Sequence, residues 1–100
     1  MIRILANDGI SDDGKLLMEE AGYEVITKKV PQNELCDVIA NYDVLLVRSA
    51  TKVTAEVITA GINLKMIGRG GVGLDNIDVE FAESKGILVF NTPAASSQAV

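Results

Sequence analysis

Two basic and two hydroxyl side chains gather in five consecutive residues, Arg48-Ser49-Ala50-Thr51-Lys52. A guanidinium can hold a carboxylate or a phosphate through two parallel hydrogen bonds, and hydroxyl groups and a second cation add to the attraction. The stretch directly follows four apolar residues, 44–47, which are typical of a buried strand. These residue types therefore indicate a site for a small anion. The alternative, which the sequence leaves open, is that Arg48 pairs with a nearby Asp and that Lys52 is solvated.

A second stretch, Gly68-Arg69-Gly70-Gly71-Val72-Gly73, matches the G-x-G-x-x-G spacing of dinucleotide-binding loops. Such a site also needs an acidic residue about 20 positions further on, where this chain has Asn91. It needs a helix that begins within the loop, but residues 74–78 intervene, and Asp75 and Asp78 would repel a phosphate. The match is therefore a weak indication of cofactor binding. Consecutive glycines can instead offer backbone N–H groups to a carboxylate, or can merely form a tight turn.

The elements that position these residues follow from an alternation of short apolar runs with helical patterns. Strands are expected over 2–6, 23–27, 44–47, 65–68 and 87–90, and helices from Ser11 or Asp12 to Ala21, from Pro31 through Tyr42, over 55–60 and from Asp78 to Gly86. This alternation predicts an α/β fold with a parallel five-stranded sheet and helices on both faces. The strand at 44–47 is wholly apolar, so it is expected to be buried on both faces. Residues 96–100 are compatible with the start of one more helix.

In an open parallel sheet, ligands bind beyond the carboxyl ends of the strands. The residues 48–52, the glycine stretch and Asn91 each follow a strand, so we expect them at one edge of the sheet. Asp8 and Asp75 lie near the same edge, but nothing in the sequence fixes their spacing. They are therefore unpersuasive as a general acid/base pair.

Composition excludes several classes of function. The chain has 100 residues, of which 48% are apolar, enough for one domain with a core. A net charge of −5 and an aromatic content of 4% argue against a nucleic-acid partner. Because Cys36 is the only cysteine and histidine is absent, an internal disulfide, a Cys–His nucleophile, a Ser–His–Asp triad and a His-containing zinc site are excluded within these residues. With no apolar run of membrane-spanning length and no secretion signal, the cytoplasm is the expected location.

Three stretches, in order along the chain, resemble the D-isomer-specific 2-hydroxyacid dehydrogenases: Val47 to Thr54, Gly68 to Asp78 and Lys85 to Pro93. Within that family, the Arg-Ser-Ala-Thr-Lys run favours the phosphoglycerate type. The resemblance implies a two-domain, NAD-dependent oxidoreductase that converts 3-phospho-D-glycerate to 3-phosphooxypyruvate in serine biosynthesis. Residues 1–100 would form the N-terminal portion of its flavodoxin-like substrate-binding domain.

By the same resemblance, Arg48 and Ser49 would hold the phosphate of 3-phosphoglycerate, the backbone at Gly70 and Gly71 would meet its carboxylate, and Asn91 would line the cleft between the domains. NAD would be bound by a cofactor domain absent from this chain. The family's catalytic Arg, Glu and His also come from later segments, so no catalytic, cofactor-binding or metal-binding residue is assigned here. The fragment alone is expected to be inactive, and the parent protein is expected to be a homo-oligomer.

The sequence is also compared with the requirements of other functions, two of which remain open. A free-standing module could bind a small anion with the same Arg48 site, and another D-2-hydroxyacid dehydrogenase would share the fold. A phosphoacceptor receiver domain needs an Asp after the third strand and a Lys after the fifth, where Arg48 and Asn91 stand, so it is rejected. The hypothesis of an NAD-binding half-domain is weakened because Asn91 is neutral where an acidic residue is needed and Asp75 would repel a phosphate.

Overall fold

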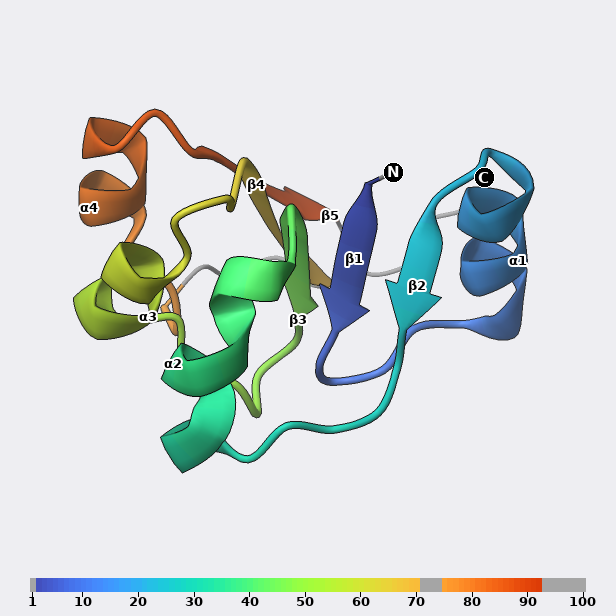
Figure 1. Cartoon of the computed structure of the whole chain (residues 1–100), viewed down its shortest axis with the longest axis horizontal. Coiled ribbons are helices and arrows are strands. Elements are labelled where there is room, and N and C mark those ends of the chain that lie inside the picture. Colours follow the sequence, from blue (N-terminus) through green and yellow to red (C-terminus); the bar gives the residue numbers. More distant parts are fainter. Residues whose placement is uncertain (1, 71–74, 93–100) are drawn as a thin grey trace.

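The computed structural model describes residues 2–70 and 75–92. Five strands form one parallel sheet in the order β2-β1-β3-β4-β5 (Figure 1). The strands are β1 (Arg3–Ala6), β2 (Glu24–Ile26), β3 (Val44–Val47), β4 (Met66–Gly70) and β5 (Leu88–Thr92). The predicted α/β class and five-stranded parallel sheet are confirmed. In this flavodoxin-like order the strand sequence changes direction between β1 and β3, the place where ligands bind in open sheets.

The helices are α1 (Asp12–Glu20), α2 (Leu35–Val38), α3 (Ala55–Ala60) and α4 (Val79–Ser84), and 3₁₀ turns at Gln32–Glu34 and Ile39–Asn41 flank α2. Three helices begin where the sequence predicts, because the side chains of Ser11, Thr54 and Asp78 each accept a hydrogen bond from a backbone N–H of the first turn. The helix expected from Pro31 through Tyr42 is instead broken into three short pieces. Its apolar side chains nevertheless face the core, as their helical spacing predicts.

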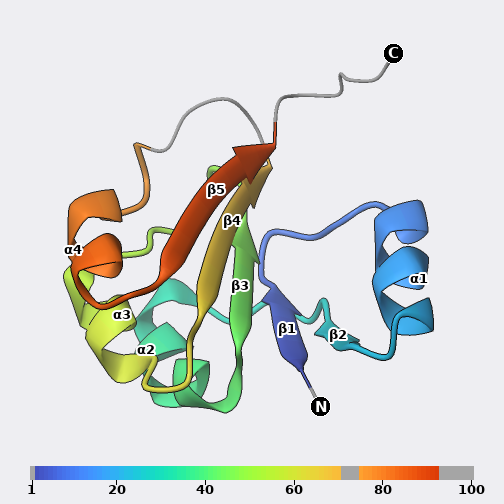
Figure 2. The same cartoon turned by 90° about the horizontal axis from the view of Figure 1, so that it is seen from above.

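The main core lies between the sheet and the layer of α2, α3 and α4. Figure 2 shows these three helices together on one face of the sheet and α1 on the other, so the prediction of helices on both faces is confirmed. The central strands and the helices each contribute fully buried side chains, namely Leu5, Leu45, Ile67, Leu35, Ile39 and Val57. Burial of these side chains holds β1, β3 and β4 in place, and with them the carboxyl edge of the sheet.

The opposite face of the sheet is covered unevenly. α1 packs beside β2 at one side of this face, and no helix of the described residues lies over β4 and β5 there (Figure 2). Leu88 is 58% exposed and Leu46 is half-buried. The expectation that 44–47 is buried on both faces is therefore wrong. Side chains alternate along a strand, and only Leu45 and Val47 lie on the fully buried face.

β4 and β5 run further at their carboxyl ends than the sequence predicts. Arg69 pairs with Asn91 in register, and Gly70 pairs with Thr92, which extends the ladder. Gly68 lies in β4, as the strand expected over 65–68 has it, and Arg69 and Gly70 continue that strand, so the first three residues of the glycine stretch belong to the sheet. The helix considered for residues 96–100 lies outside the described residues.

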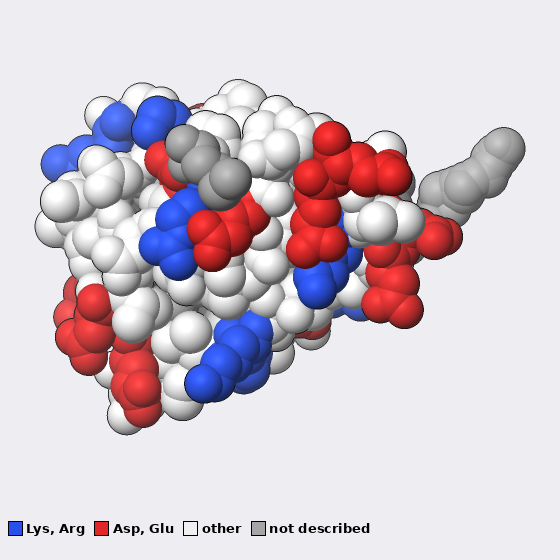
Figure 3. Space-filling model, turned by 45° about the vertical axis from the view of Figure 1, so that its right-hand side comes forward, with Lys and Arg blue, Asp and Glu red and all other residues white. Residues whose placement is uncertain are grey.

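On the face shown in Figure 3, Lys and Arg side chains alternate with Asp and Glu and form no continuous basic stripe. Acidic groups gather over α1, which carries Asp12, Asp13, Glu19 and Glu20. Within residues 2–70 and 75–92, no helix combines the length and the apolar character that a membrane crossing requires.

Candidate anion-binding site

Polar residues follow β1 and β3 at the point where the strand order changes direction. Asn7 and Asp8 come directly after β1, and Arg48 to Thr51 come directly after β3. Asn7 is only 2% exposed and Thr51 only 1%. Buried polar side chains need hydrogen-bond partners, so the bonds that these residues make decide how this edge is built.

The carboxylate of Asp8 holds the segment that contains Arg48. Its Oδ2 accepts hydrogen bonds from the backbone N–H of Arg48 at 2.7 Å and of Thr51 at 3.0 Å. Its Oδ1 accepts from the Thr51 hydroxyl at 2.6 Å and from the ammonium of Lys29. Burial by itself would raise the pKa of Asp8, but the bonds from Lys29, Thr51 and Arg48 outweigh burial and lower the pKa to about 2. The carboxylate is therefore charged at neutral pH.

Asn7 supports the same segment from the side of β2. Its Nδ2 donates to Thr51 Oγ1 at 2.9 Å and to the carbonyl oxygen of Val30 at 3.0 Å, and its Oδ1 accepts from the Val30 N–H at 2.7 Å. Its backbone N–H donates to the carbonyl oxygen of Leu46. The ends of β1 and β3 and the segment after β2 are thus joined by hydrogen bonds that are buried or partly buried.

Asn76 supports the segment from its other side. Its Nδ2 donates to the carbonyl oxygens of Arg48 and Thr51, each at 2.6 Å. An isolated parallel bridge between Val53 and Ile77 brings this asparagine into position. The segment 48–51 is therefore held through N–H groups on one side and through carbonyl groups on the other.

The backbone of Arg48 is fixed, but its guanidinium makes no ion pair with any residue that the structure describes. The side chain is exposed. The alternative in which Arg48 pairs with a nearby Asp is wrong within this part of the chain. The neighbouring carboxylate of Asp8 binds the Arg48 N–H and pairs its charge with Lys29. The positive charge of Arg48 is thus available to a ligand.

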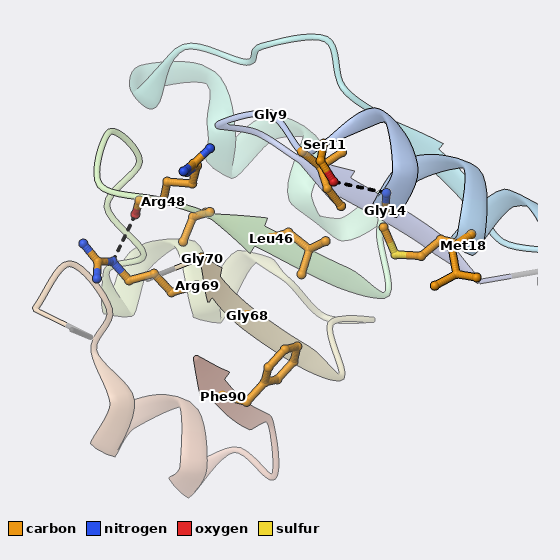
Figure 4. Close-up of a pocket in the computed structure, with 13 residues that line it drawn as sticks. Gly9, Ser11, Gly14, Met18, Leu46, Arg48, Gly68, Arg69, Gly70 and Phe90 are labelled. Atoms are coloured by element: carbon orange, nitrogen blue, oxygen red, sulfur yellow. Dashed lines mark hydrogen bonds between the residues drawn. The ribbon is translucent and has the colours of Figure 1, made fainter. Parts of the chain in front are cut away.

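A pocket of about 420 Å³ opens beside Arg48. In Figure 4, Arg48 and Arg69 lie near Gly70 at one end, while Leu46, Met18 and Phe90 form apolar walls. Nε of Arg69 donates to the carbonyl oxygen of Arg48 at 3.3 Å. A Cβ atom at Gly70 would lie 3.7 Å from Cγ of Arg48, so the arginine stem lies against the Gly70 backbone. The pocket can hold an anionic group at its charged end.

The resemblance implies five substrate-binding residues, and the structure brings two of them, Arg48 and Gly70, together at the pocket. Ser49 is exposed beside Arg48 but does not line the pocket. Asn91 is exposed on β5 at the same edge of the sheet and does not line the pocket either. Gly71 lies outside the described residues.

The described residues do not fit a bound dinucleotide at the glycine stretch. Gly68 is buried in β4, and a Cβ atom there would come within 2.6 Å of the Phe90 ring, so packing already demands this glycine. α4 begins only at Val79, where the side chain of Asp78 accepts the Phe81 N–H that a phosphate would need. The described part of the G-x-G-x-x-G stretch therefore gives no support to a dinucleotide site. The described part of the chain also contains no cluster of three or more His, Cys, Asp or Glu able to hold a metal ion.

Sequence reasoning missed the residues that support the site. The sequence places Asp8 at the correct edge of the sheet but indicates no role for it, and its partners lie 21 to 43 positions away along the chain. A polar pair directly after a buried strand, Asn7-Asp8, is the signal that could have indicated it. No pattern in the sequence indicates Asn76.

Comparisons with known proteins bear on the family and the fold of this chain. The family model for the catalytic domain of D-isomer specific 2-hydroxyacid dehydrogenases matches residues 4–100. The chain is 50% identical over 99 residues to a hydroxypyruvate reductase of Thermotoga maritima, covering 98% of this chain and 32% of that protein. It is 48% identical over 100 residues to a D-3-phosphoglycerate dehydrogenase of Methanocaldococcus jannaschii, covering 100% of this chain and 19% of that protein.

Among solved structures, the NAD⁺-bound 3-phosphoglycerate dehydrogenase of Entamoeba histolytica matches with a TM-score of 0.78 at 33% identity, over 92% of this chain and 33% of that chain. The chain therefore spans a third or less of the length of these proteins. Because the family model matches nearly every residue and the fold agrees, this chain belongs to the family of D-isomer specific 2-hydroxyacid dehydrogenases.

Proposed function

We propose that residues 1–100 are the substrate-binding part of an NAD-dependent oxidoreductase that converts 3-phospho-D-glycerate to 3-phosphooxypyruvate. Family membership and relatives named D-3-phosphoglycerate dehydrogenase support the reaction class. One observation carries the choice of an anionic substrate. The guanidinium of Arg48 stands at the pocket on a fixed backbone and has no ion pair among the described residues. A guanidinium so placed suits two parallel hydrogen bonds to a phosphate.

In this proposal Arg48 and Ser49 bind the phosphate, the backbone at Gly70 and Gly71 meets the carboxylate, and Asn91 lines the cleft. The clearance at Gly70 supports the second role, because a Cβ atom there would make only ordinary contacts with the described residues. Close packing therefore does not demand a glycine at this position, whereas access of a ligand to the backbone does. These residues bind and orient substrate, and none of them is assigned proton or hydride transfer. NAD is bound outside residues 1–100, so the fragment alone is inactive.

A second candidate function is the reduction of a 2-keto acid that carries no phosphate to the corresponding D-2-hydroxyacid. The Thermotoga maritima protein that is 50% identical is named hydroxypyruvate reductase. Hydroxypyruvate offers a carboxylate but no phosphate, and Arg48 would then bind the carboxylate. The two candidates differ in whether a phosphate is required for recognition.

The test is an NAD-linked assay of the complete protein with 3-phospho-D-glycerate and with D-glycerate, which differ only by the phosphate. We expect the phosphorylated substrate to give the higher kcat/KM. We expect Arg48→Ala to raise its KM by about tenfold or more while the KM for NAD stays unchanged, because a charge-assisted anion contact is lost. Equal or better use of D-glycerate would favour the second candidate. No NAD-linked turnover with either substrate would overturn both candidates.

A further inference from the structure

The carboxylate of Asp8 is buried beside the candidate site but does not face the pocket. Its side chain is 4% exposed, and it is absent from the pocket lining. Its four hydrogen bonds all go to donors that follow β2 or β3, on Lys29, Arg48 and Thr51. A buried charge with this many partners fixes their relative positions, because losing any one partner leaves the charge undercompensated.

We infer that Asp8 is a positioning residue that sets the direction of the Arg48 side chain and thereby builds the anion site. The inference rests on the proposed function, since it assigns Asp8 a part in recognising that same substrate. The direction of a side chain follows from its backbone, and both polar backbone groups of Arg48 are held. Asp8 accepts the N–H at 2.7 Å, and Asn76 and Arg69 donate to the carbonyl oxygen.

The arrangement requires a carboxylate and not its neutral isostere. All four partners of Asp8 are donors: two backbone N–H groups, one hydroxyl and one ammonium. An asparagine at this position has one oxygen, and its NH₂ group would face donors. If that oxygen accepts the backbone N–H groups of Arg48 and Thr51, the NH₂ group faces the Lys29 ammonium; if it accepts from Lys29, the NH₂ group faces the two backbone N–H groups. Either arrangement weakens the bonds that hold the segment carrying Arg48.

Lys29 explains how a negative charge can lie so close to an anion site. The ion pair between Lys29 and Asp8 compensates the carboxylate locally. The guanidinium of Arg48 is thereby spared from pairing with Asp8 and keeps its charge for the substrate. The Lys29–Asp8 pair thus holds the segment 48–51 and leaves the guanidinium of Arg48 to bind the ligand.

Asp43 provides a matched control within the same sheet. It lies just before β3, at the opposite end of the strands, and its carboxylate also accepts a backbone N–H and a lysine ammonium. The donors are Arg3 N at 2.9 Å and Lys65 Nζ at 3.2 Å. A purely structural role of carboxylates that join the strands of this sheet would affect Asp8 and Asp43 alike.

The experiment measures the KM for 3-phosphoglycerate, the KM for NAD, kcat and the melting temperature of the complete protein for Arg48→Ala, Asp8→Asn and Asp43→Asn. We expect Asp8→Asn to raise the KM for 3-phosphoglycerate about tenfold, with the KM for NAD and kcat within a factor of about two. Asp43→Asn is expected to lower the melting temperature and to leave the KM for 3-phosphoglycerate unchanged. Should Asp8→Asn fail to fold, Thr51→Val removes the hydroxyl partner alone, and Thr51→Ser, which keeps it, should give a smaller rise in KM.

The outcomes separate the inference from the proposed function. If Arg48→Ala raises the KM but Asp8→Asn and Thr51→Val do not, the inference is overturned and the proposed function stands. If Asp43→Asn raises the KM as much as Asp8→Asn, the effect is general loss of structure, and the inference is likewise wrong. If Arg48→Ala leaves the KM unchanged, the anion site itself fails, and the positioning role of Asp8 fails with it.

Discussion

Gly68 in β4 lies beneath the ring of Phe90 in β5, so closely that a Cβ atom at position 68 would come within 2.6 Å of the ring Cζ. The same Cβ atom would lie 2.9 Å from Cδ2 of Leu46, on the other neighbouring strand. Gly70, on the same strand, would meet only the stem of Arg48, at 3.7 Å. The two glycines of one motif thus differ: close contacts crowd a Cβ atom at Gly68, whereas a Cβ atom at Gly70 would make only ordinary contacts with the described residues.

Gly68→Ala is expected to destabilise the protein by about 1–3 kcal/mol, because the ring of Phe90 must move to accommodate the added methyl group. Gly70→Ala is the control and should change the free energy of unfolding by less than about 0.5 kcal/mol. Urea denaturation of the complete protein measures both. Equal stability of the two variants would show that Phe90 yields freely and that packing does not demand Gly68.

Acidic pH should remove the stability that the charged carboxylate of Asp8 contributes. Hydrogen bonds lower the pKa of Asp8 from its ordinary 3.8 to about 2, so the folded state resists protonation of this carboxylate. Its contribution, roughly 2 kcal/mol, is fully present above pH 4 and is lost as the pH falls through about 2. Urea denaturation at pH 5, 3 and 2 checks this expectation. Wild type should lose more stability than Asp8→Asn over this range, and parallel losses would contradict the assigned cause.

Replacing the amide group of Asn76 by a carboxylate of the same shape should lower the stability of the protein. Asn76→Asp places an oxygen against the carbonyl oxygens of Arg48 and Thr51, which now accept at 2.6 Å. We expect a loss of about 2 kcal/mol or more, because acceptors would face acceptors in a partly buried place. Asn33→Asp, at an exposed position, is the control and should be nearly neutral. The midpoint of thermal unfolding is measured for both variants. Similar midpoints would show that the bonds from Asn76 to the carbonyl oxygens of Arg48 and Thr51 do not stabilise the protein.

Arg48→Lys distinguishes charge from geometry at the proposed phosphate contact. Lysine keeps the positive charge but lacks the planar pair of donors that matches two phosphate oxygens. The KM for 3-phospho-D-glycerate should rise by about threefold to tenfold, less than for Arg48→Ala. Steady-state kinetics of both variants provide the comparison. A KM equal to that of wild type would mean that Arg48 acts only as a point charge.

Much of the fold could be predicted because its signals are local. Ser11, Thr54 and Asp78 cap helices through bonds to residues three positions away, and such bonds leave a recognisable pattern in the sequence. The strand positions likewise follow from short apolar runs. The carboxyl ends of β4 and β5 were placed too early, because their final residues are polar or glycine and join the sheet through pairing between strands.

For the candidate site as well, some features follow from the sequence and others only from the tertiary structure. The sequence by itself determined that Arg48 follows an apolar strand and that this strand ends at the carboxyl edge of a parallel sheet, where ligands bind in open α/β folds. Only the tertiary structure decided that Asp8 accepts the Arg48 N–H from 40 positions away and that Asn76 holds the Arg48 carbonyl oxygen from 28 positions away. It also decided which face of β3 stays partly open, since that depends on which helices cover the sheet. Residue types and local spacing fix which groups are present at an edge, whereas contacts between distant segments fix where those groups point.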